Sequence, residues 1–397
     1  MRVADKRESD SDFRMSQFLP AIKTIIPICL EYCRLAFATD HAGDKDVKRI
    51  IYRCSIDYVF LAFKNRTNCQ TILKQAEVLP LDLPKGSNAF YAICYRGPVN
   101  KTITQQITPH LWFDNNAEEA ARFYTSIFKP SKIKNVTTLH NTPSGTVEIF
   151  TVELLGQKFT LINAGPLFKF NPSVSFLVAC STKEEVDGLW KELSKGGTAL
   201  MELAEYPFSE KYGWVQDKYG LSWQVMFMGD RKIKQRIIPT LMFVGKQYGK
   251  AEEAINFYAS VFGNARIDNI LRYSKGEEPD KEGTVKHASF MLEGQEFAAM
   301  DSARGHNFAF NEAISFMVHC DTQKEIDYYW GKLSADPKAE QCGWLKDRYG
   351  LSWQIVPNLM DEMLKDGDKK KIAQVTEAFL QMKKLDIAKL KKAYESG

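Results

Sequence analysis

The segment "GWVQDKYGLSWQVMF" at residues 213–227 is nearly repeated as "GWLKDRYGLSWQIVP" at residues 343–357, with nine of the fifteen positions identical. Two further pairs of segments match in the same order: "AEEAARFYTSIF" at 117–128 with "AEEAINFYASVF" at 251–262, and "NPSVSFLVACST" at 171–182 with "NEAISFMVHCDT" at 311–322. Matching residues of the two copies are 130 positions apart at the start and at the end of the repeat, and 140 apart in its middle. The second copy therefore has longer early loops and a shorter stretch matching 191–212. We interpret the sequence as an internal duplication.

Each copy divides again into two halves. In the first half of copy one, "ITPHLWF" is typical of a strand, and apolar residues at helical spacing follow in 117–128. Three strand-like runs come next. The second half begins with "SVSFLVAC", and Thr182 and Glu185 then form the S/T-x-x-E pattern of a helix start; Thr322 and Glu325 repeat it in copy two. The pattern predicts β-α-β-β-β twice in each copy.

The side chains of a strand alternate between its two faces. In "LSWQVMF", Leu221, Trp223, Val225 and Phe227 share one face, which we expect to pack under helices. Ser222, Gln224 and Met226 share the other. The same division of the first strand places His110 and Trp112 opposite the helices, with Thr240 and Met242 at the matching positions of copy two.

This arrangement resembles the vicinal-oxygen-chelate superfamily, which includes glyoxalase I, extradiol dioxygenases and bleomycin-resistance proteins. More narrowly, "ITPHLWFDNNAEEAARFYTSIF", "NEAISFMVHCDTQKEIDYYW" and the tail "FLQMKKLDIAKLKKAY" resemble the PhnB-like branch. The resemblance covers about residues 105–397 and implies an α+β fold with tandem domains. In each domain two βαβββ modules would form a cupped mixed sheet with helices outside.

The expected domains are 105–228 and 236–357, packed as an internal pseudo-dimer, followed by a helical tail at 358–397. Further oligomerisation is left open. Residues 1–104 lie outside the resemblance. They form a small extra domain, a poorly ordered extension, or sequence that is not normally translated.

The resemblance implies four cup positions that carry His and Glu metal ligands in metal-using members. Copy one has His110, Asn163, Ala179 and Gln224 there, and copy two has Thr240, Asp301, His319 and Gln354. Neither set is a His/Glu set. Imidazole and carboxylate suit a divalent ion, so Asp301 and His319 are the metal candidates, in the second domain, with a salt-linked pair as the rival interpretation. The expected ligand-binding residues of the cups are His110, Trp112, Asn163, Gln224, Thr240, Met242 and Gln354.

The leading functional hypothesis is a protein that binds a small molecule in the cup, with metal-assisted chemistry on an oxygenated substrate as one version. The alternatives are a non-catalytic, resistance-type binding module and a scaffold whose cups are filled by side chains, so enzyme activity is left open. Members often carry the label 3-demethylubiquinone-9 3-methyltransferase. No glycine-rich strand-to-helix turn for S-adenosylmethionine is apparent in the sequence, which disfavours that activity.

Composition restricts the partners. The chain has 397 residues and a net charge of +4, and residues 1–106 alone carry +5, so the repeats have no basic surplus for nucleic acid. The sequence has no 20-residue apolar run of the kind a membrane span needs. The eight cysteines include no C-x-x-C pair, which is typical of scattered reduced thiols and a cytoplasmic location. A small molecule is therefore the expected partner.

Overall fold

The structure is a computed structural model that describes residues 77–79, 92–94 and 105–397. The chain separates into two compact units, Met1–Thr102 and Ile103–Gly397. In the first unit the described residues form one antiparallel pair of strands, β1 (Glu77–Leu79) and β2 (Ala92–Cys94). The three interpretations of residues 1–104 given above concern residues that lie mostly outside the described part of the chain. Everything below concerns the second unit.

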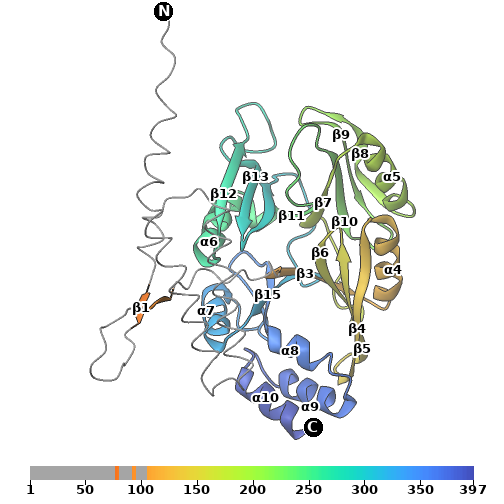
Figure 1. Cartoon of the computed structure of the whole chain (residues 1–397). Helices are drawn as coiled ribbons and strands as arrows, with labels where there is room; N and C mark the ends of the chain where they lie inside the picture. The colour runs from red at the N-terminus through yellow and green to blue at the C-terminus, as the bar shows by residue number, and fades with distance from the viewer. Residues whose placement is uncertain (1–76, 80–91, 95–104) are drawn as a thin grey trace, which may run out of the picture. The chain divides into compact units, whose positions relative to one another are not determined.

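The second unit contains four consecutive modules, coloured from yellow to blue in Figure 1. Module one consists of β3 (Ile107–Phe113), α4 (Ala117–Ile127), β4 (Ser131–Thr142), β5 (Gly145–Leu154) and β6 (Gln157–Asn163). Module two consists of β7 (Val174–Cys180), α5 (Lys183–Leu193), β8 (Thr198–Tyr206), β9 (Ser209–Gln216) and β10 (Ser222–Phe227). Both have the predicted β-α-β-β-β order.

The second copy supplies the other two modules. Module three consists of β11 (Ile237–Phe243), a 3₁₀ turn at Gly245–Gln247, α6 (Ala251–Val261), β12 (Arg266–Arg272), β13 (Val285–Leu292) and β14 (Gln295–Asp301). Module four consists of β15 (Ile314–Cys320), α7 (Gln323–Leu333), β16 (Trp344–Lys346) and β17 (Ser352–Pro357). The prediction of three strands after α7 is wrong, because the residues that copy two lacks are those that form β8 in copy one.

The predicted helix starts are confirmed. Thr182 accepts a hydrogen bond from the backbone N–H of Glu185 at 3.1 Å, and Thr322 and Glu325 form a complete capping box at the start of α7. These bonds satisfy backbone N–H groups that have no partner within the helix. Local sequence therefore fixes where α5 and α7 begin.

The two sheets exchange modules between the copies. The eight-stranded sheet has the order β12-β13-β14-β11-β7-β10-β9-β8 and so joins module three to module two. The seven-stranded sheet has the order β16-β17-β15-β3-β6-β5-β4 and joins module four to module one. Strand β11 pairs antiparallel with β7, and β15 pairs antiparallel with β3. The expectation that each copy builds its own cup is therefore wrong: each sheet takes one module from each copy.

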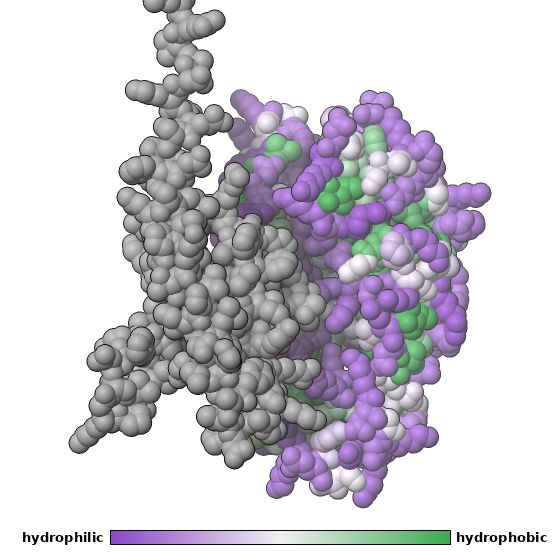
Figure 2. All heavy atoms as spheres, in the orientation of Figure 1, coloured by the Kyte–Doolittle hydropathy of each residue, from purple (hydrophilic) through white to green (hydrophobic). Residues whose placement is uncertain are grey.

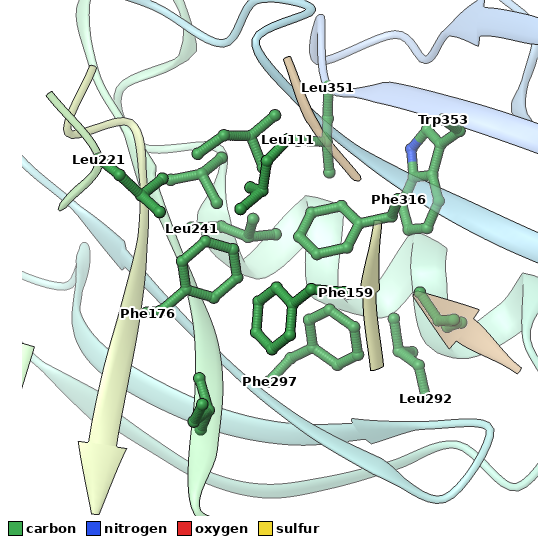
Figure 3. Packing of buried hydrophobic residues seen from close by; sticks show 14 of the residues in the cluster. Leu111, Phe159, Phe176, Leu221, Leu241, Leu292, Phe297, Phe316, Leu351 and Trp353 are labelled. Atoms are coloured by element: carbon green, nitrogen blue, oxygen red, sulfur yellow. The ribbon is translucent and has the colours of Figure 1, made fainter. Parts of the chain in front are cut away.

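The helix-covered sides of the two sheets share one hydrophobic core (Figure 3). The rings of Phe159 and Phe176 lie 5.2 Å apart between their centroids, and those of Phe297 and Phe316 lie 5.6 Å apart. In each pair one phenylalanine comes from the seven-stranded sheet and the other from the eight-stranded sheet. Burial of such large side chains is the main stabilising contribution to a fold of this kind.

Three helices follow the last strand: α8 (Asn358–Met363), α9 (Lys369–Leu380) and α10 (Ile387–Ser396). They form the predicted helical tail. No helix in the described part of the chain is long and apolar enough to cross a membrane. On the face shown in Figure 2, hydrophobic residues form scattered spots in a mainly hydrophilic surface.

Candidate ligand-binding site

The two faces of each sheet differ. The helix side holds Trp223 and Trp353, which are buried and donate their indole N–H groups to Asp217 and Asp347, each at 2.9 Å. The prediction that these tryptophans pack under the helices is confirmed. We call the opposite face of each sheet its cup, so the molecule has a seven-stranded cup and an eight-stranded cup.

The seven-stranded cup brings together polar residues from both copies. His110 on β3 lies opposite Ser315 on β15, which in turn lies opposite Ser352 on β17. Gln354 follows two residues after Ser352 on the same face, and His319 follows on β15. Trp112 also points to this side, and its indole N–H donates to the carbonyl of Gly165 at 2.8 Å. His110, Trp112, His319 and Gln354, predicted as parts of two sites, therefore belong to one cup.

Two predicted cup residues lie on the helix side instead. Asn163 pairs with Phe113, and its side-chain oxygen accepts a hydrogen bond from the N–H of Ala117 at the start of α4, at 2.7 Å. Asp301 pairs with Phe243 and is likewise at the end of its strand. The prediction that Asn163 and Asp301 point into the cup is wrong. Each lies one position away from a cup-facing position of its strand, and a shift of one position moves a side chain to the other face.

Asp301 supports the start of α6. Its carboxylate accepts hydrogen bonds from three backbone N–H groups, those of Gly249, Ala251 and Val285, at 2.8, 3.2 and 2.9 Å. Burial raises the pKa of Asp301, and these three donors act in the opposite direction. The carboxylate is therefore used as a helix cap.

The predicted metal pair does not form. Asp301 is on β14 in the eight-stranded sheet, whereas His319 is on β15 in the seven-stranded sheet. Among the described residues, no three His, Cys, Asp or Glu side chains are grouped so that they could hold a metal ion. The seven-stranded cup offers the imidazoles of His110 and His319, the amide of Gln354 and the carboxylate of Asp361, 3.9 Å from His319, but these are not grouped as the three protein ligands of a catalytic zinc site would be. The donor set does not fit a divalent ion.

The polar side chains of the eight-stranded cup satisfy one another. Gln224 accepts a hydrogen bond from the phenol of Tyr212 and donates one to Ser175, both at 2.7 Å. The indole N–H of Trp214 donates to Ser222, also at 2.7 Å. Apolar side chains fill the space around them; the cluster includes Leu177, Ile238, Ala298, Met201, Tyr206 and Met226. Thr240 and Met242, which the sequence placed in the cup of copy two, lie on β11 in this sheet and are also buried.

The seven-stranded cup holds buried polar atoms without partners. In the described residues three buried side-chain atoms make no hydrogen bond: Nδ1 of His110, Nδ1 of His319 and Oγ of Ser352. All three belong to the cup face of this one sheet. An unpartnered buried donor or acceptor costs about 1–3 kcal/mol, so such groups are normally paired with protein, water or a ligand.

The seven-stranded cup differs from the eight-stranded cup by one substitution and by the contact of one matched tryptophan. Cys342 stands where copy one has Tyr212, so Gln354 bonds Ser315 at 2.9 Å but receives no phenol. Trp344 stands where copy one has Trp214. Its ring packs edge-on against His110, with centroids 5.3 Å apart, and leaves the Ser352 hydroxyl unpaired.

Both histidines of this cup favour the neutral form. Burial lowers the pKa of His110 to about 3. Burial also lowers the pKa of His319, while the nearby carboxylate of Asp361 opposes the shift. His319 Nε2 lies 3.1 Å from the hydroxyl of Thr108. At neutral pH each ring therefore offers one donor and one acceptor nitrogen rather than a positive charge.

Sequence reasoning missed several residues of this cup, among them Ser352, whose match in copy one is Ser222. Trp344 could have been found from its match to Trp214, and Ser315 from its match to Ser175, because both pairs keep the repeat spacing. Asp361 has no counterpart in copy one and no local pattern that places it beside His319. Its approach depends on how the tail folds back, which strand alternation does not reveal.

The sequence profile of the family described as 3-demethylubiquinone-9 3-methyltransferase matches this chain twice, at residues 105–226 and 235–356. Among solved structures, a PhnB protein from Bacillus cereus is 41% identical over 31% of this chain and 99% of its own, with a TM-score of 0.30. A protein from Staphylococcus aureus is 30% identical over 31% of this chain and 95% of its own, with a TM-score of 0.14.

Glyoxalase I from Zea mays is 12% identical over 65% of this chain and 96% of its own, with a TM-score of 0.41. Among proteins with curated descriptions, none matches the chain. The two stretches matched by the family profile cover more than half of the 397 residues. The protein therefore belongs to this family, with two tandem domains that are similar to the PhnB protein.

Proposed function

We propose that the chain binds a small, uncharged molecule in the seven-stranded cup, by hydrogen bonds and aromatic contacts and without a metal ion. The supporting observation is that the unpartnered buried atoms of the described residues, on His110, His319 and Ser352, share this cup. A ligand that pairs with them recovers the free energy that their burial costs.

The chemistry of the cup favours an aromatic compound that carries a hydroxyl or carbonyl group. Trp112 contacts both Trp344 and Phe168, with ring centroids 6.1 and 5.1 Å apart, and such rings favour edge-to-face contacts with another ring. Neutral histidines and a serine can each donate or accept a hydrogen bond. An anionic ligand would have no charge-balancing imidazolium at His110, since burial holds the pKa of that residue at about 3.

The metal-assisted version is not proposed, because the donor set does not fit. Methyl transfer, named in the description of the family, is not proposed either, since the sequence lacks a glycine-rich turn for S-adenosylmethionine. The eight-stranded cup corresponds to the scaffold hypothesis, because its polar side chains bond one another.

Titration calorimetry and protein-detected NMR with phenol, and with toluene as its apolar match, test the proposal. Phenol is expected to bind more tightly than toluene and to perturb the ring nitrogens of His110. Ser352→Ala is expected to weaken phenol binding about three- to tenfold, the worth of one hydrogen bond, whereas Ser222→Ala in the other cup leaves it unchanged. Equal affinity for phenol and toluene, or equal loss in both variants, would overturn the proposal. If phenol causes no shift of the His110 resonances, because water alone occupies the cup, the proposal is also overturned.

A further inference from the structure

The tail occupies the place of the strand that module four lacks. In module two, β8 pairs with β9 and completes the edge of the eight-stranded sheet. Module four has no such strand. Instead the backbone N–H groups of Cys342 and Gly343 donate to the carbonyls of Met382 and Lys383 in the tail, both at 2.7 Å. The turn between α9 and α10 thus bonds the edge that a strand bonds in the other copy.

The tail also covers the seven-stranded cup with apolar side chains. Met317 on β15 and Val356 on β17 point to the cup and belong to a separate hydrophobic cluster. Its remaining buried members are Leu139, Met363, Leu364, Val375, Phe379, Leu385 and Leu390. All but Leu139 come from residues 358–397. Among the described residues the eight-stranded cup has no equivalent cover; side chains of β8 and β9, among them Met201, Tyr206 and Trp214, pack there instead.

The first tail helix, α8, brings a carboxylate close to Nδ1 of His319, the ring nitrogen that makes no hydrogen bond. Oδ2 of Asp361 lies 3.9 Å from Nδ1 of His319, and 37% of the Asp361 side chain is exposed. That separation is too long for a direct hydrogen bond and suits one bridging atom, such as the oxygen of a water or a ligand hydroxyl. Asp361 therefore faces the same cup as the atoms on which the proposed function rests.

The contact between the tail and the sheet is incompletely packed along β4. A cavity of about 220 Å³ lies there. Residues of β4 line one side, including Thr138 and His140, and Leu364, Lys365 and Ile372 line the other. Leu364 also belongs to the cluster that covers the cup. This cavity is half-open and lies beside the contact of α9 with β4, the most extensive contact between the tail and the sheet.

We infer that helices α8–α10 form a built-in cover over the binding site, which replaces the missing edge strand, and that Asp361 holds a ligand hydroxyl against Nδ1 of His319. The second part rests on the proposed function, and the first does not. A ligand enters when the tail separates from the sheet. Closure then buries the ligand and adds Asp361 to its hydrogen-bond partners.

The cover is tested without ligand, by amide hydrogen exchange on the full chain. Val375 on α9 is fully buried in the tail cluster, so Val375→Asp is expected to lift the tail. The amides of Cys342 and Gly343 should then exchange at least about tenfold faster, while those of Tyr212 and Gly213, their matches in copy one, keep their rates. Lys384→Ala removes only the exposed ion pair with Asp327 and is the matched control, with no change expected at either pair.

Unchanged exchange at Cys342 and Gly343 in Val375→Asp, with faster exchange in α9, would overturn the cover. If this variant melts the whole chain, the milder Val375→Ala gives the same comparison. The ligand contact is tested separately with Asp361→Asn, which should weaken phenol about three- to tenfold and toluene hardly at all. Equal phenol affinity in Asp361→Asn would overturn that contact and leave the cover standing. Absence of phenol binding in the unaltered chain would overturn the proposed function instead.

Discussion

Matched serines in the two cups have opposite relations to their surroundings. Ser222 accepts the hydrogen bond of Trp214, whereas Ser352 is buried with no partner for its hydroxyl. The same residue type at matching positions of the repeat therefore has a hydroxyl that is used inside the protein in one cup and a hydroxyl that is free to bind a ligand in the other. What differs is the neighbour, since Trp344 turns to His110.

This difference predicts opposite effects of one substitution on stability. Ser222→Ala should lower the free energy of unfolding by about 1–3 kcal/mol, because it leaves the indole N–H of Trp214 without an acceptor. Ser352→Ala should leave it unchanged or raise it, because it removes a hydroxyl that has no partner. Chemical denaturation of both variants measures the difference, and equal destabilisation would contradict the assigned hydrogen bonds.

His110 predicts a specific dependence of stability on pH. Its pKa is about 3 in the folded protein and close to 6.5 when the chain is unfolded. Between these values the unfolded state binds the extra proton, so stability falls as the pH drops from about 6.5 toward 3, by up to about 1.4 kcal/mol per pH unit. Above about pH 6.5 both states are neutral and this contribution is constant.

Replacing His110 tests that account. His110→Gln should flatten the acid side of a plot of melting temperature against pH, and Thr240→Gln at the matching position should not. The pKa values of His287 and His319 are lowered as well, so some slope will remain. An identical slope in His110→Gln and the unaltered chain would show that His110 is protonated in the fold.

Strand alternation predicts a residue's face only when the phase is counted through the whole strand. In β6, Phe159, Leu161 and Asn163 alternate on the helix side, and in β14 Phe297, Ala299 and Asp301 do the same. The pattern was present in the sequence. Assigning Asn163 and Asp301 from family ligand positions overrode it, whereas His110 and Gln354, assigned from alternation, lie where predicted.

At the scale of elements, the cap residues predict a graded loss of stability. Asp301→Ala leaves three backbone N–H groups without an acceptor, and Asn163→Ala leaves one. Each lost cap bond costs about 0.5–2 kcal/mol, so Asp301→Ala should be clearly the more destabilising. Thermal unfolding measures this, and metal titration of both variants provides the check. Loss of metal binding in Asp301→Ala without loss of stability would restore the rejected metal assignment.

The shortened stretch of copy two shows a limit of sequence reasoning at this scale. The missing residues fall within the stretch that matches 191–212, and their absence removes the counterpart of β8. Length alone does not distinguish a lost loop from a lost strand. The replacement by the tail is also hidden, because the bonds from Cys342 and Gly343 reach residues about 40 positions away that share no pattern with them.

For the whole molecule, the sequence predicts four modules but not which of them join. The two junctions are equivalent in register: Pro239 lies opposite Phe176 where β11 meets β7, and Pro109 lies opposite Phe316 where β3 meets β15. Either pairing of modules would satisfy the same residues. The strand sequences therefore do not reveal that the sheets are shared between the copies.

That equivalence predicts how copy one behaves alone. Within one copy, β3 and β7 belong to different sheets, and each lacks its antiparallel neighbour when copy two is removed. Because β7 matches β15 in sequence and register, β7 of a second molecule can pair with β3. A shortened chain of residues 105–231 should therefore form a two-fold homodimer with exchanged modules.

Light scattering at several concentrations measures the mass of this shortened chain. Its unfolding midpoint should rise with protein concentration, since folding and association are then linked. Lysine in place of Val178, which lies at the junction opposite Ile237 in the full chain, should abolish the dimer together with the folded state. A monomer that folds at all concentrations would mean that β3 and β7 can pair within one copy, and that the exchange seen in the full chain is a consequence of its linker.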